Sequence, residues 1–500
     1  KNNFIDQTTR ISFKFNGQQL FGYKGDTLAS ALLANNIHLV GRSFKYHRPR
    51  GIMTCGSEEP NAIVQIGNDS SLTDPNVRAT EIELYEGLEA SSQNCWPSVN
   101  FDIGGINNFL SPLLPAGFYY KTFMWPASFW EKYEYFIRHS AGLGKAPTKS
   151  DPDIYDHQYS HCDVLVVGGG ISGIISAKLS AEKGLDTILI DDKNFLGGST
   201  IYQENEAYKV NDIYSNEWLA KEIKSLKNYP NLIIKNRTSL AAFHGYNYLL
   251  ARENLTDHLS ISDRKNKIRQ RLWKIRAKKV IIASGSIERP LIFSNNDRPG
   301  IILSSSIKKY IDYYGVKTGE NISLFTNNDS AYETAISLNK SGVKVNVIVD
   351  IRKNSESLIV KEALDLGLKV LWESTVVETQ GYKKIKSFEV MKLSDDGNNV
   401  IGNKTKHNCD CLGISGGWTP MVHLFTQSGG KLKFRHEDNV FIPDEDKTPP
   451  NQISVGSCNG EFKLDEIVTR TIENLKSFLD LSKTCYDEMK INCPDEKSKR

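Results

Sequence analysis

Apolar and polar positions alternate through the first part of the chain. The stretch RISFKFNGQQLFGYK, residues 10–24, alternates on both sides of Asn16-Gly17, a pair that favours a two-residue hairpin turn. Asp26 follows as a candidate N-cap of a helix over TLASALLANN, and NAIVQIG has the composition of a further strand. The pattern predicts a small α+β domain within residues 1–95.

Residues 96–136 depart from this pattern, because 13 of these 41 positions are aromatic and four prolines interrupt them. The ordinary explanation is a connector whose rings pack on neighbouring domains. The alternative is contact with a partner subunit, since aromatic side chains are enriched at protein interfaces. Together with the linker-like residues that follow, 96–160 is expected to connect two domains.

From Cys162 to about Asp480, strand-like and helix-like segments alternate, which is typical of α/β domains built on parallel sheets. We expect a nucleotide-binding unit of the Rossmann type over residues 161–315 and 411–480. A second Rossmann-like unit over 316–410 would be inserted in it. Charged residues are frequent in 481–500, which we expect to be a frayed tail.

The glycine spacing after the first of these strands carries the strongest chemical signal. In VLVVGGGISG, Gly168 allows a tight turn, Gly170 allows the backbone to approach a pyrophosphate, and Gly173 allows the helix to pack on the strand. The next strand, TILI, ends at Asp191, 21 residues beyond Gly170. This carboxylate can accept hydrogen bonds from both ribose hydroxyls and would repel a 2′-phosphate. The pattern therefore favours NAD or FAD over NADP.

Two later segments extend this site. A second glycine turn at Gly198 and Ser199 would approach the diphosphate. The strand in AKKVIIASGSIERP ends at Ser284-Gly285 and looks like the A-T-G strand of two-dinucleotide flavoproteins, where the chain returns to the first nucleotide unit. The predicted fold class is therefore α/β, a two-dinucleotide-domain flavoprotein-like Rossmann fold preceded by a small α+β domain.

Two departures from that architecture narrow the prediction. FAD enzymes of this kind usually carry Gly-Asp in the closing segment, whereas Gly456 is followed by Ser457 here, which favours NAD. In the second unit, Thr326, Asn328 and Ala331 stand where two glycines and a small residue are expected. Side chains at the first two positions would block a pyrophosphate, so we expect the second unit to keep the fold with a lost or altered site.

Composition excludes several classes of protein. Hydrophobic residues make up 39% and charged residues 24%, as in ordinary globular chains, and a net charge of +3 gives no field that attracts nucleic acid or an anionic membrane. No run approaches 18 apolar residues, the start lacks the apolar core of a secretory signal, and the eight cysteines form no C-x-x-C pair. We expect a cytoplasmic protein with no membrane span, no nucleic-acid partner, no metal site and no local catalytic triad.

Six motifs together resemble one family. KYHRPRG, TCGSEEPNA, VVGGGISG, NNDRPGI, FTNNDSAYETA and GISGGWTPMVHLFTQSGG resemble the alpha subunits of heterotetrameric sarcosine oxidases, over about residues 10–475. The large subunit of N-methylglutamate dehydrogenase is a close competitor. The resemblance implies NAD on this chain and FAD and FMN on a partner beta subunit, where sarcosine would be converted to glycine and oxygen to peroxide. It also implies smaller subunits and a folate-binding domain, placed C-terminally or on a separate chain.

The resemblance also implies individual contacts. Leu240 would offer backbone atoms to the adenine, and Ser457 would close the pocket from the last strand. No catalytic residue is assigned to this chain. The candidate cofactor-binding residues are Gly168, Gly170, Ser172, Gly173, Asp191, Asp192, Lys193, Gly198, Ser199, Leu240, Ser284, Gly285, Gly456 and Ser457.

The same resemblance gives the first domain a ferredoxin-like fold. Relatives with a [2Fe–2S] cluster carry C-x4-C-x2-C in this loop, whereas Cys55 is followed by Pro60 and Ile63 at those spacings. We therefore expect no iron–sulfur cluster. The HRPRG sequence at 47–51 would serve packing or subunit contact, or else form a basic surface loop.

Three hypotheses about function remain. The chain is the NAD-binding subunit of a flavin-dependent N-methyl amino acid oxidase or dehydrogenase, which acts on a CH–NH bond as part of a complex. Alternatively, it is a self-contained pyridine-nucleotide or flavin oxidoreductase. The third hypothesis is a purely structural assembly subunit with a vestigial nucleotide site.

Overall fold

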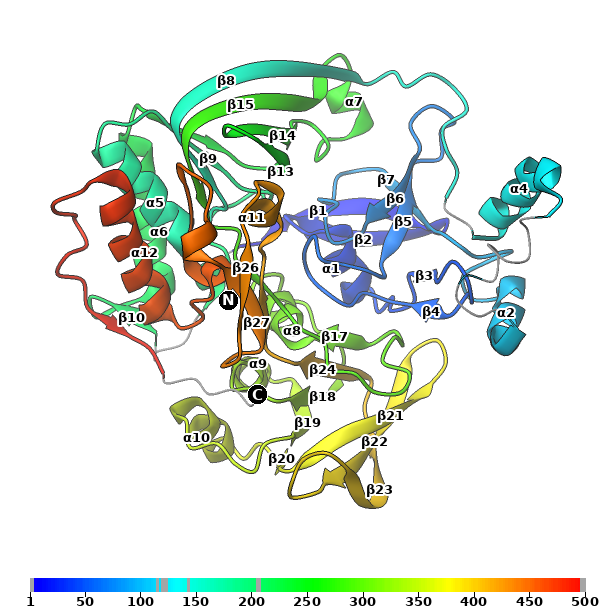
Figure 1. The fold of residues 1–500 in the computed structure, drawn as a ribbon. Coiled ribbons are helices and arrows are strands. Elements are labelled where there is room, and N and C mark those ends of the chain that lie inside the picture. The colour runs from blue at the N-terminus through cyan, green and yellow to red at the C-terminus, as the bar shows by residue number, and fades with distance from the viewer. Residues whose placement is uncertain (1–3, 114–116, 118–124, 142–143, 204–207, 495–500) are drawn as a thin grey trace.

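The computed structural model describes residues 4–113, 117, 125–141, 144–203 and 208–494 (Figure 1). A first domain lies beside two α/β units, and the helices of the connector lie at the outer edge of the first domain (Figure 1). Among the described residues, no helix is both long enough and apolar enough to cross a membrane.

The first domain is a five-stranded sheet of order β2-β1-β7-β5-β6 with one helix packed on it. The predicted hairpin is confirmed, because Asn16 and Gly17 both have positive φ, at 52° and 79°. The predicted N-cap is wrong by one residue: Thr27 accepts from the backbone N–H of Ser30, while the Asp26 carboxylate accepts from the Ser30 hydroxyl. The elements are β1 (Asp6–Phe15), β2 (Gln18–Lys24), α1 (Leu28–Ala34), β3 (Gly41–Arg42), β4 (Pro49–Arg50), β5 (Ile63–Ile66), β6 (Asp74–Arg78) and β7 (Leu88–Ser92).

The first α/β unit is a seven-stranded sheet. Its order is β12-β9-β8-β15-β14-β13, with β28 also paired to β15. Strands β12, β9, β8, β15 and β28 are parallel, and β14 and β13 continue the same sheet as antiparallel strands. The strands are β8 (Ile154–Val167), β9 (Thr187–Ile190), β12 (Leu232–Lys235), β13 (Thr238–His244), β14 (Tyr248–Asn254), β15 (Ile268–Ile282) and β28 (Gln452–Ser454). The helices are α5 (Ile171–Glu182), α6 (Ser215–Ser225), α7 (Ile261–Arg264), α11 (His423–Gln427) and α12 (Leu464–Leu479), and β26 (Leu432–Arg435) pairs with β27 (Val440–Pro443).

Strand β8 begins at Ile154, earlier than the start at Cys162 that the apolar run indicates. Its polar first half pairs with the basic first half of β15, and Asp156 accepts two hydrogen bonds from Arg271 across the two strands. Charge pairing therefore extends a strand that hydrophobicity alone does not reveal. Both strands arch over the top of the molecule in Figure 1.

The second α/β unit is inserted between β16 and β25, which pair as a two-stranded ribbon. Its parallel sheet has the order β17-β24-β18-β19-β20, and an antiparallel sheet β21-β22-β23 flanks it. Strands β17 and β24 lie outside the predicted limits 316–410 of this unit, and both belong to its sheet. The elements are β16 (Ser286–Glu288), β17 (Ile301–Leu303), α8 (Ser304–Asp312), β18 (Asn321–Thr326), α9 (Ser330–Lys340), β19 (Lys344–Asp350), α10 (Leu358–Asp365), β20 (Val370–Leu371), β21 (Ser374–Gly381), β22 (Ile385–Leu393), β23 (Val400–Asn408), β24 (Cys411–Ser415) and β25 (Trp418–Pro420).

The connector leaves large apolar side chains in solvent. Its described elements include α2 (Ile106–Phe109) and α4 (Trp130–Ala141). Five aromatic side chains and one leucine are between 69% and 84% exposed, and we call these six residues the aromatic surface: Trp96, Phe101, Phe109, Leu113, Trp125 and Phe136. Packing on neighbouring domains, the ordinary explanation for such residues, does not apply to these six. Phe118, Tyr119, Tyr120 and Phe123 lie outside the described residues.

The described part of the 481–500 segment is packed, so the expectation of a frayed tail is wrong for residues 481–494. Tyr486 is buried, and its hydroxyl donates to Glu222 at 2.6 Å. Strand β29 (Ile491–Asn492) pairs with β10 (Lys209–Val210), which in turn pairs with β11 (Ile213–Tyr214). The charged composition of this segment gave no indication that Tyr486 and β29 pack against the rest of the chain.

The HRPRG loop is used within the chain. The His47 ring lies 2.7 Å from the buried carboxylate of Asp102, which also accepts from the backbone N–H of Trp96. Arg48 and Arg50 both pair with Asp297 of the NNDRPG motif. Two motifs of unassigned role therefore contact each other and hold the first domain against the chain that leads into the second unit.

Candidate nucleotide-binding site

The glycine loop joins β8 to α5 with two close backbone contacts. A Cβ on Gly168, whose φ is +106°, would lie 2.3 Å from the carbonyl oxygen of Ala283. A Cβ on Gly173 would lie 1.8 Å from the carbonyl oxygen of Gly168. Both positions therefore require glycine for packing between the helix and the sheet.

Gly170 differs from its two neighbours. It has φ of −72° and caps the N-terminus of α5, and a Cβ there would meet no atom within 4 Å. The first N–H groups of α5 have no partner within the helix, so they are free to bind an anion. The space in front of Gly170 is therefore available to a group that approaches the helix N-terminus.

Asp191 follows β9 and turns its carboxylate back onto the glycine loop. Oδ2 accepts from the backbone N–H of Gly169 at 2.6 Å, and Oδ1 accepts from the backbone N–H of Lys193 at 2.8 Å. Burial, with a contribution from Asp192, raises the pKa of Asp191 to about 6. Each carboxylate oxygen keeps a lone pair that can accept from a further donor. Hydrogen bonds from a ribose are therefore compatible with this geometry, and this role of Asp191 stays a prediction.

Asp192 and Lys193 pair with each other, with Nζ 3.0 Å from Oδ2. The ion pair raises the pKa of Lys193 against the opposing effect of burial. The chain then returns beside these residues at the start of β13, where the backbone N–H of Thr238 donates to the carbonyl of Asp191 at 2.8 Å. This contact places Leu240, two residues along β13, near the same edge of the sheet.

The closing segment meets the loop from the other side. A Cβ on Gly456, whose φ is +72°, would lie 2.2 Å from the hydroxyl of Ser172. Ser172 in turn accepts from Thr471 of α12 at 3.1 Å. Thr471 belongs to no recognised motif, and only its buried place on an amphipathic helix could have marked it.

The remaining candidates lie around this arrangement. A Cβ on Gly285 would lie 4.0 Å from the hydroxyl oxygen of Ser457. The hydroxyl of Ser284 donates to the carbonyl of Met421. A Cβ on Gly198 would lie 3.1 Å from the Cα of Gly170, so the second glycine turn does approach the first. Ser199 is exposed beside that turn. These contacts bring the two glycine turns, Asp191 and the closing segment together around one loop, whereas Leu240 and Ser199 are placed there only by their neighbours in the chain.

The corresponding loop of the second unit is filled by its own side chains. Thr326 and Asn328 are buried and hydrogen-bond to each other across the turn, and Asn328 also donates to the Ser415 hydroxyl at 2.9 Å. At the end of β19, the carboxylate of Asp350 accepts from the Arg352 guanidinium at 2.7 Å. Arg352 also donates to Asp329 at 2.6 Å. The second loop thus has internal partners where the first has open space.

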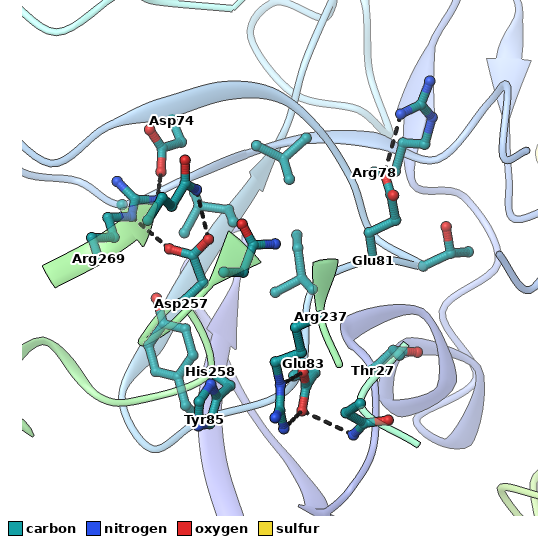
Figure 2. Close-up of a pocket in the computed structure, with 18 of the residues that line it drawn as sticks. Thr27, Asp74, Arg78, Glu81, Glu83, Tyr85, Arg237, Asp257, His258 and Arg269 are labelled. Carbon is teal, nitrogen blue, oxygen red and sulfur yellow. Dashed lines mark hydrogen bonds and ion pairs between the residues drawn. The ribbon is translucent and has the colours of Figure 1, made fainter. Parts of the chain in front are cut away.

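A cavity of about 740 Å³ separates the first domain from the first α/β unit (Figure 2). It reaches Asp192 and Lys193, next to the acid that ends β9. Figure 2 shows Glu83 of the first domain facing Arg237 at the start of β13, and their side chains are joined by a hydrogen bond of 2.8 Å. Glu83 also accepts from Asn194 at 3.0 Å. Sequence patterns gave no signal for Glu83, because its partners lie on another unit.

Arg269 of β15 forms a second charged contact across this cavity. It pairs with Asp257 at 2.6 Å and also with Asp74 of the first domain (Figure 2). The first domain is therefore attached to the first α/β unit by ion pairs on both sides of the cavity.

A glycine loop at a helix N-terminus, an acid after the second strand and an inserted second Rossmann-like unit together define a dinucleotide-binding oxidoreductase fold. Residues 162–456, more than half of the chain, match the pyridine nucleotide-disulphide oxidoreductase family, and the chain belongs to that family. The predicted fold class is confirmed at this level.

Among curated proteins, the chain is 41% identical to the sarcosine oxidase subunit alpha of Rhizobium meliloti (strain 1021) over 450 residues. That match covers 88% of this chain and 43% of the relative. Sarcosine oxidase subunit alpha of Corynebacterium sp. (strain U-96) is 31% identical, over 91% of this chain and 42% of the relative. The resemblance to these alpha subunits is confirmed, and the chain spans less than half the length of the relatives it matches.

A solved structure shows the same fold at low identity. L-proline dehydrogenase from P. horikoshii superposes with a TM-score of 0.62 and 18% identity, covering 98% of this chain and 79% of that one. At this identity the similarity describes the fold.

Residues 8–95 match the 2Fe-2S iron-sulfur cluster binding domain family, which contradicts the expectation that the chain carries no iron–sulfur cluster. The exclusion rested on one loop, whereas the match rests on the whole domain. The matched residues contain two cysteines, Cys55 and Cys95, whereas such a cluster takes four thiolates. In the part of the chain that the structure describes, no group of three or more His, Cys, Asp and Glu side chains is arranged to hold a metal ion. Within the described ranges, the side chains as placed do not by themselves form a ligand set.

Proposed function

We propose that this chain is the NAD-binding subunit of a flavin-dependent amine oxidoreductase of the sarcosine oxidase type. The observation that carries the proposal is the 41% identity to a sarcosine oxidase subunit alpha over 88% of the chain. The open space at Gly170, in front of the N-terminus of α5, supports a bound dinucleotide.

The choice of NAD is supported by the two ends of the site. Asp191 presents a carboxylate where a 2′-phosphate would be repelled. Ser457 stands where FAD-binding relatives of this architecture carry an acid, and it lies beside Gly285. NAD would hold its adenosine toward β13 and its pyrophosphate at Gly170, with Ser199 near the diphosphate.

Oxidation of the amine is proposed to take place on a partner. A beta-type subunit would carry FAD and FMN, sarcosine would be oxidised at its CH–NH bond to yield glycine, and oxygen would be reduced to peroxide at the flavin. The aromatic surface supports such a partner, because six large apolar side chains in water are stabilised by an apolar protein face. A folate-binding domain, as a further segment or a separate chain, belongs to the same proposal.

The test is a comparison of the full chain purified alone and purified with its co-expressed partner subunits. Nucleotides released by denaturation are identified by mass spectrometry and counted against protein. We expect about one NAD per chain in both preparations and flavin only with the partner. Flavin released from the chain alone would favour a self-contained flavin oxidoreductase, and the absence of any nucleotide would favour a structural subunit.

Substrate identity is tested on the assembled complex. Peroxide formation and reduction of an artificial electron acceptor are measured with sarcosine and with N-methylglutamate. Sarcosine-dependent peroxide is the expected result. Turnover of N-methylglutamate with the acceptor and without peroxide would assign the chain to the dehydrogenase instead.

A further inference from the structure

A hollow of about 710 Å³ opens on the second α/β unit, away from the glycine loops. It lies where β18 and β19 begin, at Asn321 and Lys344, whereas the loop that would face a nucleotide follows the other end of β18. We call it the lysine hollow. Its lining residues are Asn321, Lys344, Asn346, Val347, Lys369, Lys384, Ile385, Lys386, Lys406, His407, Asn408, Cys409 and Asp410.

The lining carries five lysines and one carboxylate. Lys344, Lys369 and Lys386 come from three separate segments and are exposed. Among the described residues, none of these three ammonium groups has an ion-pair partner within 4.0 Å. Like charges gathered in this way repel one another, and a bound anion would relieve that repulsion.

The carboxylate in the hollow does not neutralise these three lysines. Asp410 accepts from the backbone N–H groups of Glu320 and Asn321, at 2.9 and 2.8 Å. Its nearest lysine is Lys384, at 3.8 Å. The Lys384 ammonium also lies 2.8 Å from the ring of His38 in the first domain, so this lysine is already engaged.

The lining of the hollow also includes apolar and neutral polar residues. Val347, Ile385 and Cys409 are buried. Asn321, Asn346 and Asn408 belong to the same lining, and the Asn346 amide donates to the carbonyl of Asn408 at 3.2 Å. The volume lies within the range of small-molecule sites, and the many charged residues of the lining favour a charged ligand.

We propose that the lysine hollow binds a small molecule that carries at least two negative charges, as phosphate or carboxylate groups. Three unpaired ammonium groups around one concave space favour such an anion over a neutral or cationic ligand. The site is separate from the NAD site proposed above, because nucleotides bind at the carboxyl ends of parallel strands and this hollow lies at their amino ends. It therefore does not depend on the proposed function.

The experiment is calorimetric titration of the full chain with two probes, inorganic tripolyphosphate and citrate, at low and at high salt. The test variant is Lys369→Ser with Lys386→Ser. The control variant is Lys353→Ser with Lys361→Ser, which removes the same charge from exposed positions of the same unit outside the hollow. Circular dichroism checks that both variants keep the fold.

We expect saturable binding of about one equivalent of at least one probe, which weakens with salt. The test variant should bind roughly tenfold or more weakly, because two charge-assisted hydrogen bonds are lost, while the control keeps the original affinity. Binding of tripolyphosphate alone would assign the site to phosphate ligands, and binding of citrate alone would assign it to carboxylate ligands. Binding of both probes would mean that the site accepts either class of anion. No saturable binding of either probe, or equal weakening in the two variants, would overturn the proposal.

Discussion

The guanidinium of Arg48 donates two parallel hydrogen bonds to the carboxylate of Asp297, from Nε to Oδ2 at 2.7 Å and from Nη2 to Oδ1 at 2.6 Å. The two residues are 249 positions apart in the chain. Bidentate pairs of this kind fix orientation as well as distance. The contact therefore aligns the first domain with the segment that leads into the second α/β unit.

This pair makes stability depend on pH. The hydrogen bonds from Arg48 and Arg50 outweigh burial and lower the pKa of Asp297 to about 2, from its usual 3.8. A carboxyl with a lowered pKa stabilises the fold above its unfolded pKa and loses that effect as the pH falls from about 4 toward 2. Asp297→Asn should lower the free energy of unfolding by about 2 kcal/mol at pH 7.

Urea unfolding at several pH values checks this prediction. The difference in the free energy of unfolding between the unsubstituted chain and Asp297→Asn should shrink as the pH falls below about 4. Asp395→Asn, at an exposed position, serves as the control and should have no effect. A difference that stays constant down to pH 3 would contradict the electrostatic origin.

Gly170 and Gly173 should separate nucleotide binding from folding. A methyl group at Gly170 enters open space, so Gly170→Ala should keep the melting temperature while lowering the bound NAD. A methyl group at Gly173 meets the Gly168 carbonyl, so Gly173→Ala should destabilise the fold by about 1–3 kcal/mol. Nucleotide content and thermal unfolding of both variants are measured side by side. Full NAD retention by Gly170→Ala would place the pyrophosphate elsewhere.

Asp191 should make NAD binding depend on pH. Its pKa of about 6 means that the carboxylate is present above that value and protonated below it. If ribose hydroxyls donate to the carboxylate, affinity should fall roughly five- to tenfold as the pH drops from 7.5 to 5, the loss of about one hydrogen bond. Asp191→Asn should bind NAD weakly with no such dependence. Titration calorimetry at four pH values measures the NAD affinity of the unsubstituted chain, of Asp191→Asn and of the control Asp186→Asn. The same pH profile in Asp191→Asn and Asp186→Asn would exclude Asp191 as the group that causes the pH dependence.

Arg352 should be needed for stability of the second unit. Asp329 and Asp350 are fully buried, and removal of the guanidinium would leave two carboxylates without their cation. Arg352→Ala should therefore cost about 3–5 kcal/mol. Arg470→Ala, which breaks an exposed pair with Glu473, should change stability by less than about 0.5 kcal/mol. Urea unfolding of both variants checks the contrast, and equal small effects would show that the buried network contributes little.

The aromatic surface should matter for association and little for folding. Phe109 and Trp125 are 84% and 83% exposed, so the variant Phe109→Ser with Trp125→Ser should keep the stability of the isolated chain within about 0.5 kcal/mol. Its binding to the co-expressed partner should weaken at least about tenfold, because buried aromatic anchors dominate interface energetics. Tyr246→Ser, at a 96% exposed position outside this surface, is the control. Co-purification yield and sedimentation measure both, and unchanged assembly would assign the surface another role.

Much of the fold was predictable because its signals are local. The hairpin at Asn16-Gly17 and the loop at Gly168 follow from steric rules that act within a few residues. The acid at Asp191 follows from strand periodicity. The early start of β8 was not predictable, because its polar residues are paired with charges of β15 more than 100 positions away. The packed segment around Tyr486 was missed for the same reason.

The amino-acid sequence by itself determined the order of the units, the glycine loop and the family to which the chain belongs. Only the tertiary structure decided which charges are satisfied. It pairs Arg48 with Asp297 and closes the second loop with Arg352. Among the described residues, it leaves Lys344, Lys369 and Lys386 of the hollow without an ion-pair partner. The reason is physical: periodicity and backbone sterics act between neighbours in the chain, whereas charge pairing depends on distances that exist only after the units have packed.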